Sequence, residues 1–115
     1  MEPPITTYSV DPTLVEPVFF KVEASPTTGS TIQLNRYARQ YLLLKPAIGL
    51  LALTVNFPTN PVDKDVVVIG TSKSVTVLTL GGMGNTILAG LSSLILGGFG
   101  RWVYDAPSTS WFRIG

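Results

Sequence analysis

The stretch VTVLTLGGMGN, residues 75–85, decides the fold class of this chain. Its first six residues are rich in β-branched side chains, and apolar and polar residues nearly alternate, which predicts a half-buried β-strand. The glycine-rich run that follows predicts a tight turn, because glycine adopts positive φ without steric cost. The basic unit is therefore a short strand that ends in a turn.

The same stretch lies in a segment without charged residues, which runs from residue 74 to residue 100. That length could cross a bilayer. However, glycine clusters interrupt it at residues 81–85 and 97–98, and Thr, Ser or Asn breaks its apolar residues every few positions. We therefore expect strands here, and we expect no membrane partner.

Short strands separated by turn residues recur from residue 18 to the end of the chain. We predict strands at residues 18–24, 31–35, 40–45, 51–57, 65–70, 75–80, 86–89, 93–96, 99–104 and 111–114. Two stretches, residues 35–43 and 89–96, could instead form a turn or two of helix, although both lack good caps. Regularly spaced short strands are typical of sandwiches, jelly rolls and barrels. The predicted fold is all-β, a β-sandwich of jelly-roll type.

A weak internal repeat links two of the predicted strands. LTV at residues 53–55 precedes Asn60, and LTL at residues 78–80 precedes Asn85 with the same spacing. Two copies of so short a pattern are too few to predict a solenoid. We interpret them as two equivalent strands of the sandwich.

The first sixteen residues are predicted to form an extended N-terminal arm. They contain Pro3, Pro4 and Pro12 and few large apolar groups. Proline fixes its own φ and favours extended backbone in the residue before it. The predicted organisation is an arm at residues 1–16 and a single β-sandwich domain at residues 17–115.

Charge differs between the arm and the chain that follows it. The arm and the next strand carry Glu2, Asp11, Glu16 and Glu23 against a single lysine, whereas residues 36–45 carry two arginines and a lysine. One interpretation is an acidic arm that docks on a basic patch of a neighbouring subunit. The alternative is a solvated, uneven surface.

The composition excludes several classes of function. The 115 residues include no cysteine and no histidine, which removes thiolate chemistry, the commonest general base and the commonest zinc ligand. The net charge of +1 offers no electrostatic basis for binding nucleic acid. Only 13% of residues are charged, against about 25% in typical domains. Such a composition is typical of a β protein with many turns, or of a protein whose surface is largely covered by partners.

No group of residues has the pattern of a catalytic, cofactor or metal site. Asp63 and Asp65 could touch one calcium ion, but the stretch lacks the dense acidic and glycine pattern of a calcium loop, so we interpret it as a solvated turn. The glycines at residues 81–84 are not followed by the Lys and Ser or Thr of a phosphate-binding loop. We expect no enzyme, no cofactor and no metal.

The last two strands are aromatic and flank a turn at residues 105–110. Trp102 and Tyr104 share one face of the first strand, and Trp111 could pair across the turn with Tyr104. The favoured interpretation is a final hairpin that seals the core. The alternative is an aromatic face for a sugar or a subunit interface, flanked by Arg101 and Arg113.

Three segments in this order resemble the virion proteins of tailed bacteriophages: QYLLLKPAIGLLALTVNF at residues 40–57, DKDVVVIGTSKSVTVLTLGGMGNTIL at residues 63–88, and FGRWVYDAPSTSWFRIG at residues 99–115. The resemblance covers roughly residues 30–115. It departs from the family at Lys64, which stands where the family's Asp-Gly-Gln turn has glycine.

The resemblance implies one of two roles. The first is a bacteriophage capsid decoration, or cement, protein that oligomerises as a trimer, binds the major capsid protein and stabilises the head surface of the virion. The second is a carbohydrate- or receptor-binding β module of a tail fibre or tailspike. We favour the first, because a short stand-alone copy of the module fits decoration better.

Candidate contact residues fall into three groups. In the arm, the anchors would be Ile5, Tyr8 and Val10, which could also add a strand to a neighbour's sheet edge. The polar contacts would be Arg36, Arg39 and Arg101. The aromatic group is Trp102, Tyr104 and Trp111, which the receptor-binding alternative predicts to be an exposed platform.

Overall fold

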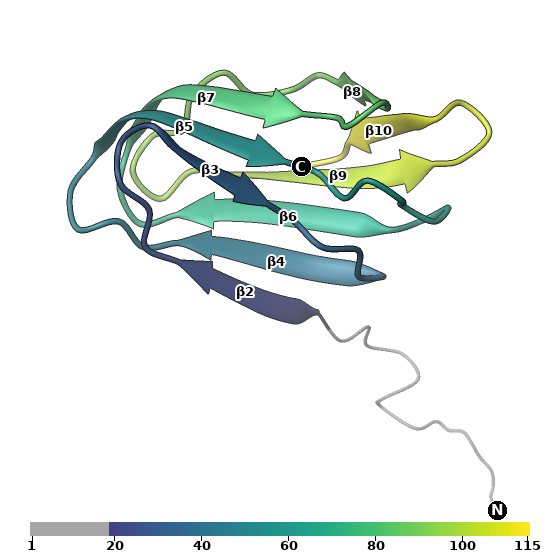
Figure 1. Cartoon of the computed structure of the whole chain (residues 1–115), viewed down its shortest axis with the longest axis horizontal. Helices are drawn as coiled ribbons and strands as arrows, with labels where there is room; N and C mark the ends of the chain where they lie inside the picture. Colours follow the sequence, from purple (N-terminus) through teal and green to yellow (C-terminus); the bar gives the residue numbers. More distant parts are fainter. Residues whose placement is uncertain (1–18) are drawn as a thin grey trace, which may run out of the picture.

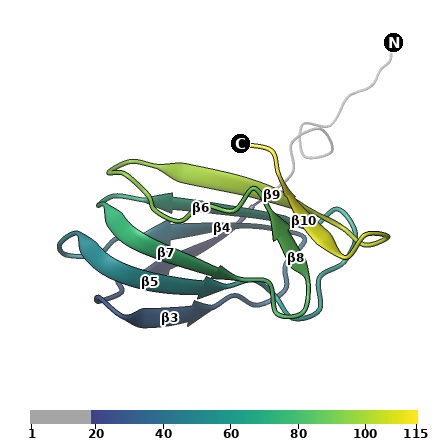
Figure 2. The same cartoon turned by 90° about the horizontal axis from the view of Figure 1, so that it is seen from above.

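A computed structural model describes residues 19–115, which fold into two β-sheets packed face to face (Figures 1 and 2). The larger sheet has six strands in the order β2-β4-β6-β9-β10-β8, and the smaller has three in the order β3-β5-β7. The strands are β2 Phe20–Ala24, β3 Ser30–Gln33, β4 Arg39–Leu44, β5 Leu50–Asn56, β6 Val66–Thr71, β7 Val75–Gly81, β8 Thr86–Leu88, β9 Phe99–Asp105 and β10 Ser110–Arg113. The described part of the chain contains no helix, so the all-β prediction is confirmed. Accordingly, residues 19–115 include no helix long and apolar enough to cross a membrane.

Nine of the ten predicted strands are present, with bounds that differ by one or two residues. The tenth, at residues 93–96, is reduced to one isolated bridge between Leu94 and Val75. Residues 35–43, one of the two possible helices, contain the start of β4. Alternation and turn residues are local signals, which is why the strand positions follow from them.

The chain passes from one sheet to the other at each step from β2 to β7. Strands β2, β4 and β6 lie side by side in parallel, as do β3, β5 and β7. Each pair of successive strands therefore forms one coil of a solenoid-like arrangement, which Figure 1 shows from the side. The chain then runs back through residues 89–98 to β9, which pairs antiparallel with β6.

This topology corrects the jelly-roll part of the fold prediction. A jelly roll is built from antiparallel strands in Greek keys. Here five of the seven strand pairs in the described chain are parallel, and only those of β9 with β6 and with β10 are antiparallel. Parallel neighbours need a crossover connection, and the passage through the opposite sheet supplies it. Alternation along one strand carries no information about the direction of its neighbour.

The internal repeat marks neighbouring coils of this arrangement. Leu53 lies opposite Leu78, Thr54 opposite Thr79 and Val55 opposite Leu80 in the parallel pair of β5 and β7. The two copies are equivalent strands, as expected, but they are hydrogen-bonded parallel neighbours rather than separate strands of a sandwich. The repeat was thus a signal of the solenoid-like winding, although two copies were too few to establish it.

The core lies between the two sheets and centres on three aromatic side chains. Phe57, at the end of β5, packs edge-on against Trp102 and Trp111, with ring centroids 5.4 and 5.0 Å apart. Trp111 pairs with Tyr104 across the β9–β10 hairpin, as predicted. Both tryptophans are fully buried and Tyr104 is 6% exposed. The interpretation of this hairpin as a seal on the core is therefore confirmed.

Positive φ occurs where the glycine cluster predicted it. In the turn after β7, Met83 has φ 53° and Gly84 has φ 95°. A Cβ atom on Gly82 would collide with the carbonyl group of Asn85. The cluster is therefore a structural turn.

Lys64 also adopts positive φ, at 72°, where the family resemblance has glycine. A Cβ atom makes this backbone conformation roughly 1–2 kcal/mol less favourable than it is for glycine. Glycine gives back part of this advantage, because it has more conformational entropy in the unfolded chain. We expect Lys64→Gly to raise the free energy of unfolding by about 0.5–1 kcal/mol in a urea titration. Lys64→Ala, which removes the same charge but keeps Cβ, should give no such gain. Equal effects of the two changes would contradict the backbone explanation.

Candidate functional site: an apolar hollow on the six-stranded sheet

The outer face of the six-stranded sheet is unusually apolar for a surface. Along β4, Gln40, Leu42 and Leu44 point into the core, so Tyr41 and Leu43 point outward. The register places Tyr41 beside Val68 of β6, and Val68 beside Arg101 of β9. One step along the strands, Leu43 lies beside Gly70, and Gly70 beside Phe99. Apolar side chains thus continue across three neighbouring strands.

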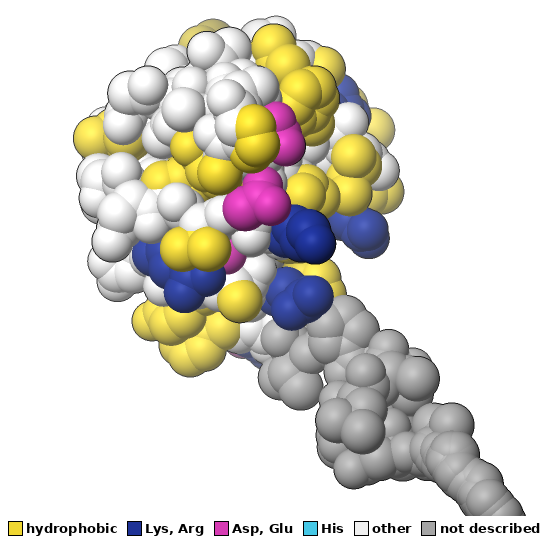
Figure 3. Space-filling model, turned by 90° about the vertical axis from the view of Figure 1, so that its right-hand side faces the viewer, with side chains coloured by type: hydrophobic (Ala, Val, Ile, Leu, Met, Phe, Trp, Pro, Cys, Tyr) yellow, Lys and Arg dark blue, Asp and Glu magenta, His cyan; other side chains and the backbone are white. Residues whose placement is uncertain are grey.

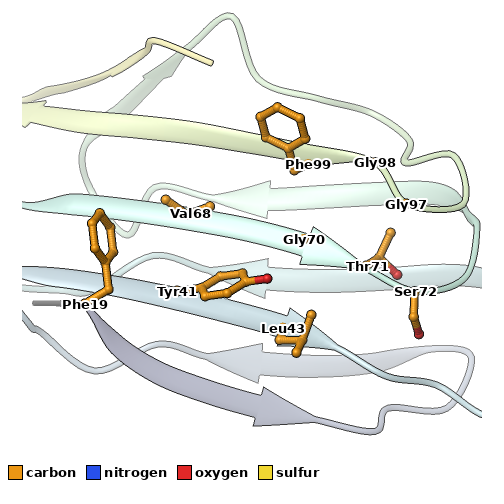
Figure 4. A pocket seen from close by; sticks show the side chains of 10 residues that line it. All are labelled: Phe19, Tyr41, Leu43, Val68, Gly70, Thr71, Ser72, Gly97, Gly98 and Phe99. Carbon is orange, nitrogen blue, oxygen red and sulfur yellow. The ribbon is translucent and has the colours of Figure 1, made fainter.

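These residues line an open hollow of about 640 Å³ on that face. Phe19 and Phe99 stand at two sides of it, with Tyr41 and Val68 between them (Figure 4). The remaining lining residues are Leu43, Gly70, Thr71, Ser72, Gly97 and Gly98. The side chain of Phe99 is 61% exposed and that of Phe19 37%. We call this surface the outer hollow.

Gly70 makes the floor of the outer hollow. A Cβ atom at this position would lie 3.6 Å from Cε1 of Tyr41 and 4.0 Å from Cβ of Phe99, which are ordinary contact distances. The backbone therefore accepts a side chain here, and its absence leaves the space between the two rings open. A larger residue at position 70 would fill the hollow from below.

Three basic residues lie on the outer face near the outer hollow, and one acidic residue, Glu23, lies beside Leu43. Lys21 lies beside Tyr41 in the register, Arg101 beside Val68, and Arg39 one outward position before Tyr41 on β4. Neither Arg39 nor Arg101 forms an ion pair with another residue of the described chain. Figure 3 views one end of the molecule and shows several Lys and Arg side chains there, with Asp and Glu side chains beside them. An acidic partner would find complementary charge here.

Lys21 is held at the edge of this face by a small ion-pair network. Its Nζ lies 2.6 Å from Oε2 of Glu23, and Nζ of Lys45 lies 3.5 Å from Oε1 of the same carboxylate. The hydrogen bond from Lys21, followed by the charges of Lys21 and Lys45, lowers the pKa of Glu23 below its ordinary value. All three side chains are exposed, so salt screens the pairs.

The titration of Glu23 should show this network. A carboxylate whose pKa is lowered on folding adds stability above its unfolded pKa, and that contribution disappears as pH falls through the folded value. We expect an NMR titration midpoint for Glu23 below its ordinary 4.5 at low salt. The midpoint should move back toward 4.5 in Lys21→Ala and in about 0.5 M NaCl, where the Debye length is only a few ångströms. A titration midpoint that is the same in Lys21→Ala and at high salt as in the parent chain at low salt would contradict the pairing.

Of the polar contact candidates, Arg39 and Arg101 lie beside the outer hollow, and Arg36 does not. Arg36 forms a bidentate pair with Asp65, with Nε 2.9 Å from Oδ2 and Nη2 2.7 Å from Oδ1. The hydrogen bond to Asp65 raises the pKa of Arg36. Asp65 is 3% exposed and also accepts a hydrogen bond from the backbone N–H of Val62. Asp65 thus holds Arg36 in place from within the chain, and the role of the exposed Arg36 as a partner contact stays a prediction. Asp65 is not the solvated residue that we expected.

The burial of the aromatic candidates corrects their assignment as contact residues. Trp102, Tyr104 and Trp111 are buried between the sheets, so they offer almost no surface to a partner. The exposed platform that the receptor-binding alternative predicts is not formed by these three residues. The arm candidates Ile5, Tyr8 and Val10 lie outside the described residues, as does the arm itself.

The residues of the outer hollow were missed, although the sequence holds a signal for them. Strands β4 and β6 contain the uninterrupted apolar runs LLL at residues 42–44 and VVVI at residues 66–69. Such runs are typical of strands that are covered on both faces. One face of these strands contacts the core, and nothing in the described chain covers the other.

Comparison with known proteins adds no family. No family model matches the chain, and no curated protein matches it. A chain from a solved structure described as "Structure of a chaperone-substrate complex" is similar at 17% sequence identity and a TM-score of 0.48. The similarity covers 75% of this chain and 16% of that chain.

Proposed function

We propose that this protein binds and assembles on a virion surface as a capsid decoration protein, without catalytic chemistry of its own. It forms a homo-oligomer, a trimer, and contacts the major capsid protein of a bacteriophage head. The resemblance of residues 30–115 to tailed-bacteriophage virion proteins supports the setting. The observation that carries the assembly part is the apolar outer face of the six-stranded sheet.

That face offers an apolar surface that a partner could cover. Contiguous apolar patches on soluble proteins commonly mark sites where another molecule binds. Here Phe19, Tyr41, Val68 and Phe99 form one patch on a rigid sheet, and the chain has few charged residues elsewhere to offset it. Burial of the patch against a partner would remove the cost of exposing it. Several such contacts on one shell, made by linked subunits, would bind far more tightly than each contact alone.

Binding to assembled shells is the direct test. Shells of the major capsid protein are incubated with the full-length chain, sedimented, and assayed for bound protein over a concentration series. We expect saturable binding, and we expect Val68→Glu to weaken it by roughly tenfold or more, because a carboxylate in an apolar contact is desolvated. Thr79→Glu, an exposed position on β7 in the other sheet, is the matched control and should bind like the parent.

Two results would count against the proposal. One is a folded full-length chain that does not sediment with shells at any concentration. The other is Val68→Glu binding as well as Thr79→Glu, which would remove the outer face from the contact. In either case the receptor-binding module becomes the better candidate, with Phe19, Tyr41 and Phe99 as its exposed aromatic residues.

A further inference from the structure

We propose that the outer hollow of one copy receives the N-terminal segment of a second copy, with apolar side chains from residues 5–10 seated between Phe19 and Phe99. The occupant is thus a defined piece of this same chain, residues 1–18. The inference deepens the proposed function, on which it rests for the claim that the chain oligomerises. It names the contact that joins the copies.

The chemistry of the segment suits the hollow. Residues 5–10 read ITTYSV and lie in the longest proline-free run before the described residues, which is residues 5–11 between Pro4 and Pro12. β-Branched and aromatic residues favour extended backbone. An extended segment would present Tyr8 and Val10 on one face, toward an open, apolar hollow, and Ile5 on the other. The hollow offers the aromatic rings of Phe19, Tyr41 and Phe99 and the bare floor at Gly70.

Charge favours the same occupant. Residues 1–18 contain Glu2, Asp11 and Glu16 and no lysine or arginine. The outer face carries Arg39 and Arg101, which have no acidic partner within the described chain. Opposite charges at the rim of an apolar contact guide association and select its register. A second copy therefore supplies apolar side chains that cover the hollow and acidic side chains that pair with Arg39 and Arg101.

The segment is long enough to reach a neighbour. The described chain begins at Phe19, which itself forms one side of the hollow. Eighteen extended residues span up to roughly 60 Å. The hollow crosses β4, β6 and β9, which are two strand spacings or about 10 Å. Most of the segment's length is therefore available to bridge the distance between two copies.

Strand β2 runs from Phe20 along the hollow toward Thr71 and Ser72 (Figure 4). Occupation of the hollow by a second copy makes the parent chain an oligomer, whereas occupation by the same copy leaves it a monomer. The size of the parent chain in solution therefore distinguishes the two arrangements.

Donor and acceptor surfaces then differ within each copy. One copy gives its segment and another gives its hollow, which is a head-to-tail contact. Such contacts close into a ring when the rotation between copies permits, and a trimer is one closed ring. Each copy in the ring would donate once and accept once.

Complementation between two full-length variants tests this arrangement. The donor-defective variant carries Ile5→Ser, Tyr8→Ser and Val10→Ser and keeps the hollow. The acceptor-defective variant carries Gly70→Leu, which fills the hollow and keeps the segment. Sedimentation velocity over a concentration series gives the size of each variant alone and of a 1:1 mixture. Circular dichroism and thermal unfolding verify that each is folded, and Val68→Glu replaces Gly70→Leu if the latter unfolds.

We expect the parent chain to be an oligomer, each variant alone to be a monomer, and the mixture to form a heterodimer. Raising the salt concentration should shift the parent toward monomer, because the rim contacts are ionic. An oligomer of the donor-defective variant, a monomeric parent, or a mixture that stays monomeric would overturn the inference. Shell binding is measured separately. If the chain forms an oligomer but does not bind shells, only the proposed function is refuted. If the chain binds shells but the two variants do not complement each other, only the inference is refuted.

Discussion

Trp102→Ala should lower the free energy of unfolding by about 3–5 kcal/mol, the largest single loss that we expect in this chain. Trp102 is fully buried at the centre of the core, where it contacts the ring of Phe57 and projects from the middle of β9. Removing the indole creates a cavity that the two rigid sheets cannot close. Native domains are stable by only about 5–15 kcal/mol, so the variant loses a large part of its total stability.

Urea denaturation followed by circular dichroism measures this loss. Trp102→Phe is the matched control, because it keeps an aromatic ring in place and should cost roughly 1–2 kcal/mol for the smaller cavity. Nε1 of Trp102 has no hydrogen-bond partner among the described residues, so the control removes no hydrogen bond. A loss below about 1 kcal/mol for Trp102→Ala would show that the core is not packed around this residue.

Asp65→Ala should cost about 2–3 kcal/mol, more than Arg36→Ala. The carboxylate of Asp65 is buried and accepts hydrogen bonds from Nε and Nη2 of Arg36 and from the backbone N–H of Val62. It thereby ties the start of β4 to the turn before β6. Replacing Asp65 breaks all three hydrogen bonds. Replacing Arg36, whose side chain is 36% exposed, leaves the bond to Val62 in place.

A double-mutant cycle separates the two contributions. The free energies of unfolding of Asp65→Ala, Arg36→Ala and the double variant give a coupling energy, which we expect to be about 1–2 kcal/mol. Asp65→Asn, which keeps the shape of the side chain, should recover part of the loss through the hydrogen bond from Val62. Additive single effects would mean that the bidentate pair contributes nothing to stability.

The positions of the strands were predictable from the sequence, but their neighbours were not. Strand β7 was recognised from its own alternation and from the glycine turn that follows it. The parallel pairing of Leu53 with Leu78 joins residues 25 positions apart in the chain, and no local pattern in either strand specifies it. A hairpin has only one short connection to satisfy, which is why the pairing of Trp111 with Tyr104 was predicted correctly.

The candidate site was likewise predictable only in part: residue types could be singled out from the sequence, but their neighbours in the fold could not. Arg39 and Arg101 were singled out by residue type, and the register brings both to the outer face. Arg36 belongs to the same stretch of sequence, but the fold places buried Asp65 against it. The tryptophans were ambiguous between core and surface, because alternation states that two residues share a face without stating which face is covered.

The sequence by itself determined that this chain forms short strands and tight turns, that its last two strands make an aromatic hairpin, and that it contains no histidine and no cysteine. These properties depend on residue type and on spacings of a few residues. Only the tertiary structure decided the parallel, solenoid-like order of the strands, the pairing of Arg36 with Asp65 and the outer hollow over Gly70. Each of these depends on contacts between residues far apart in the chain, and such contacts exist only after the two sheets have packed together.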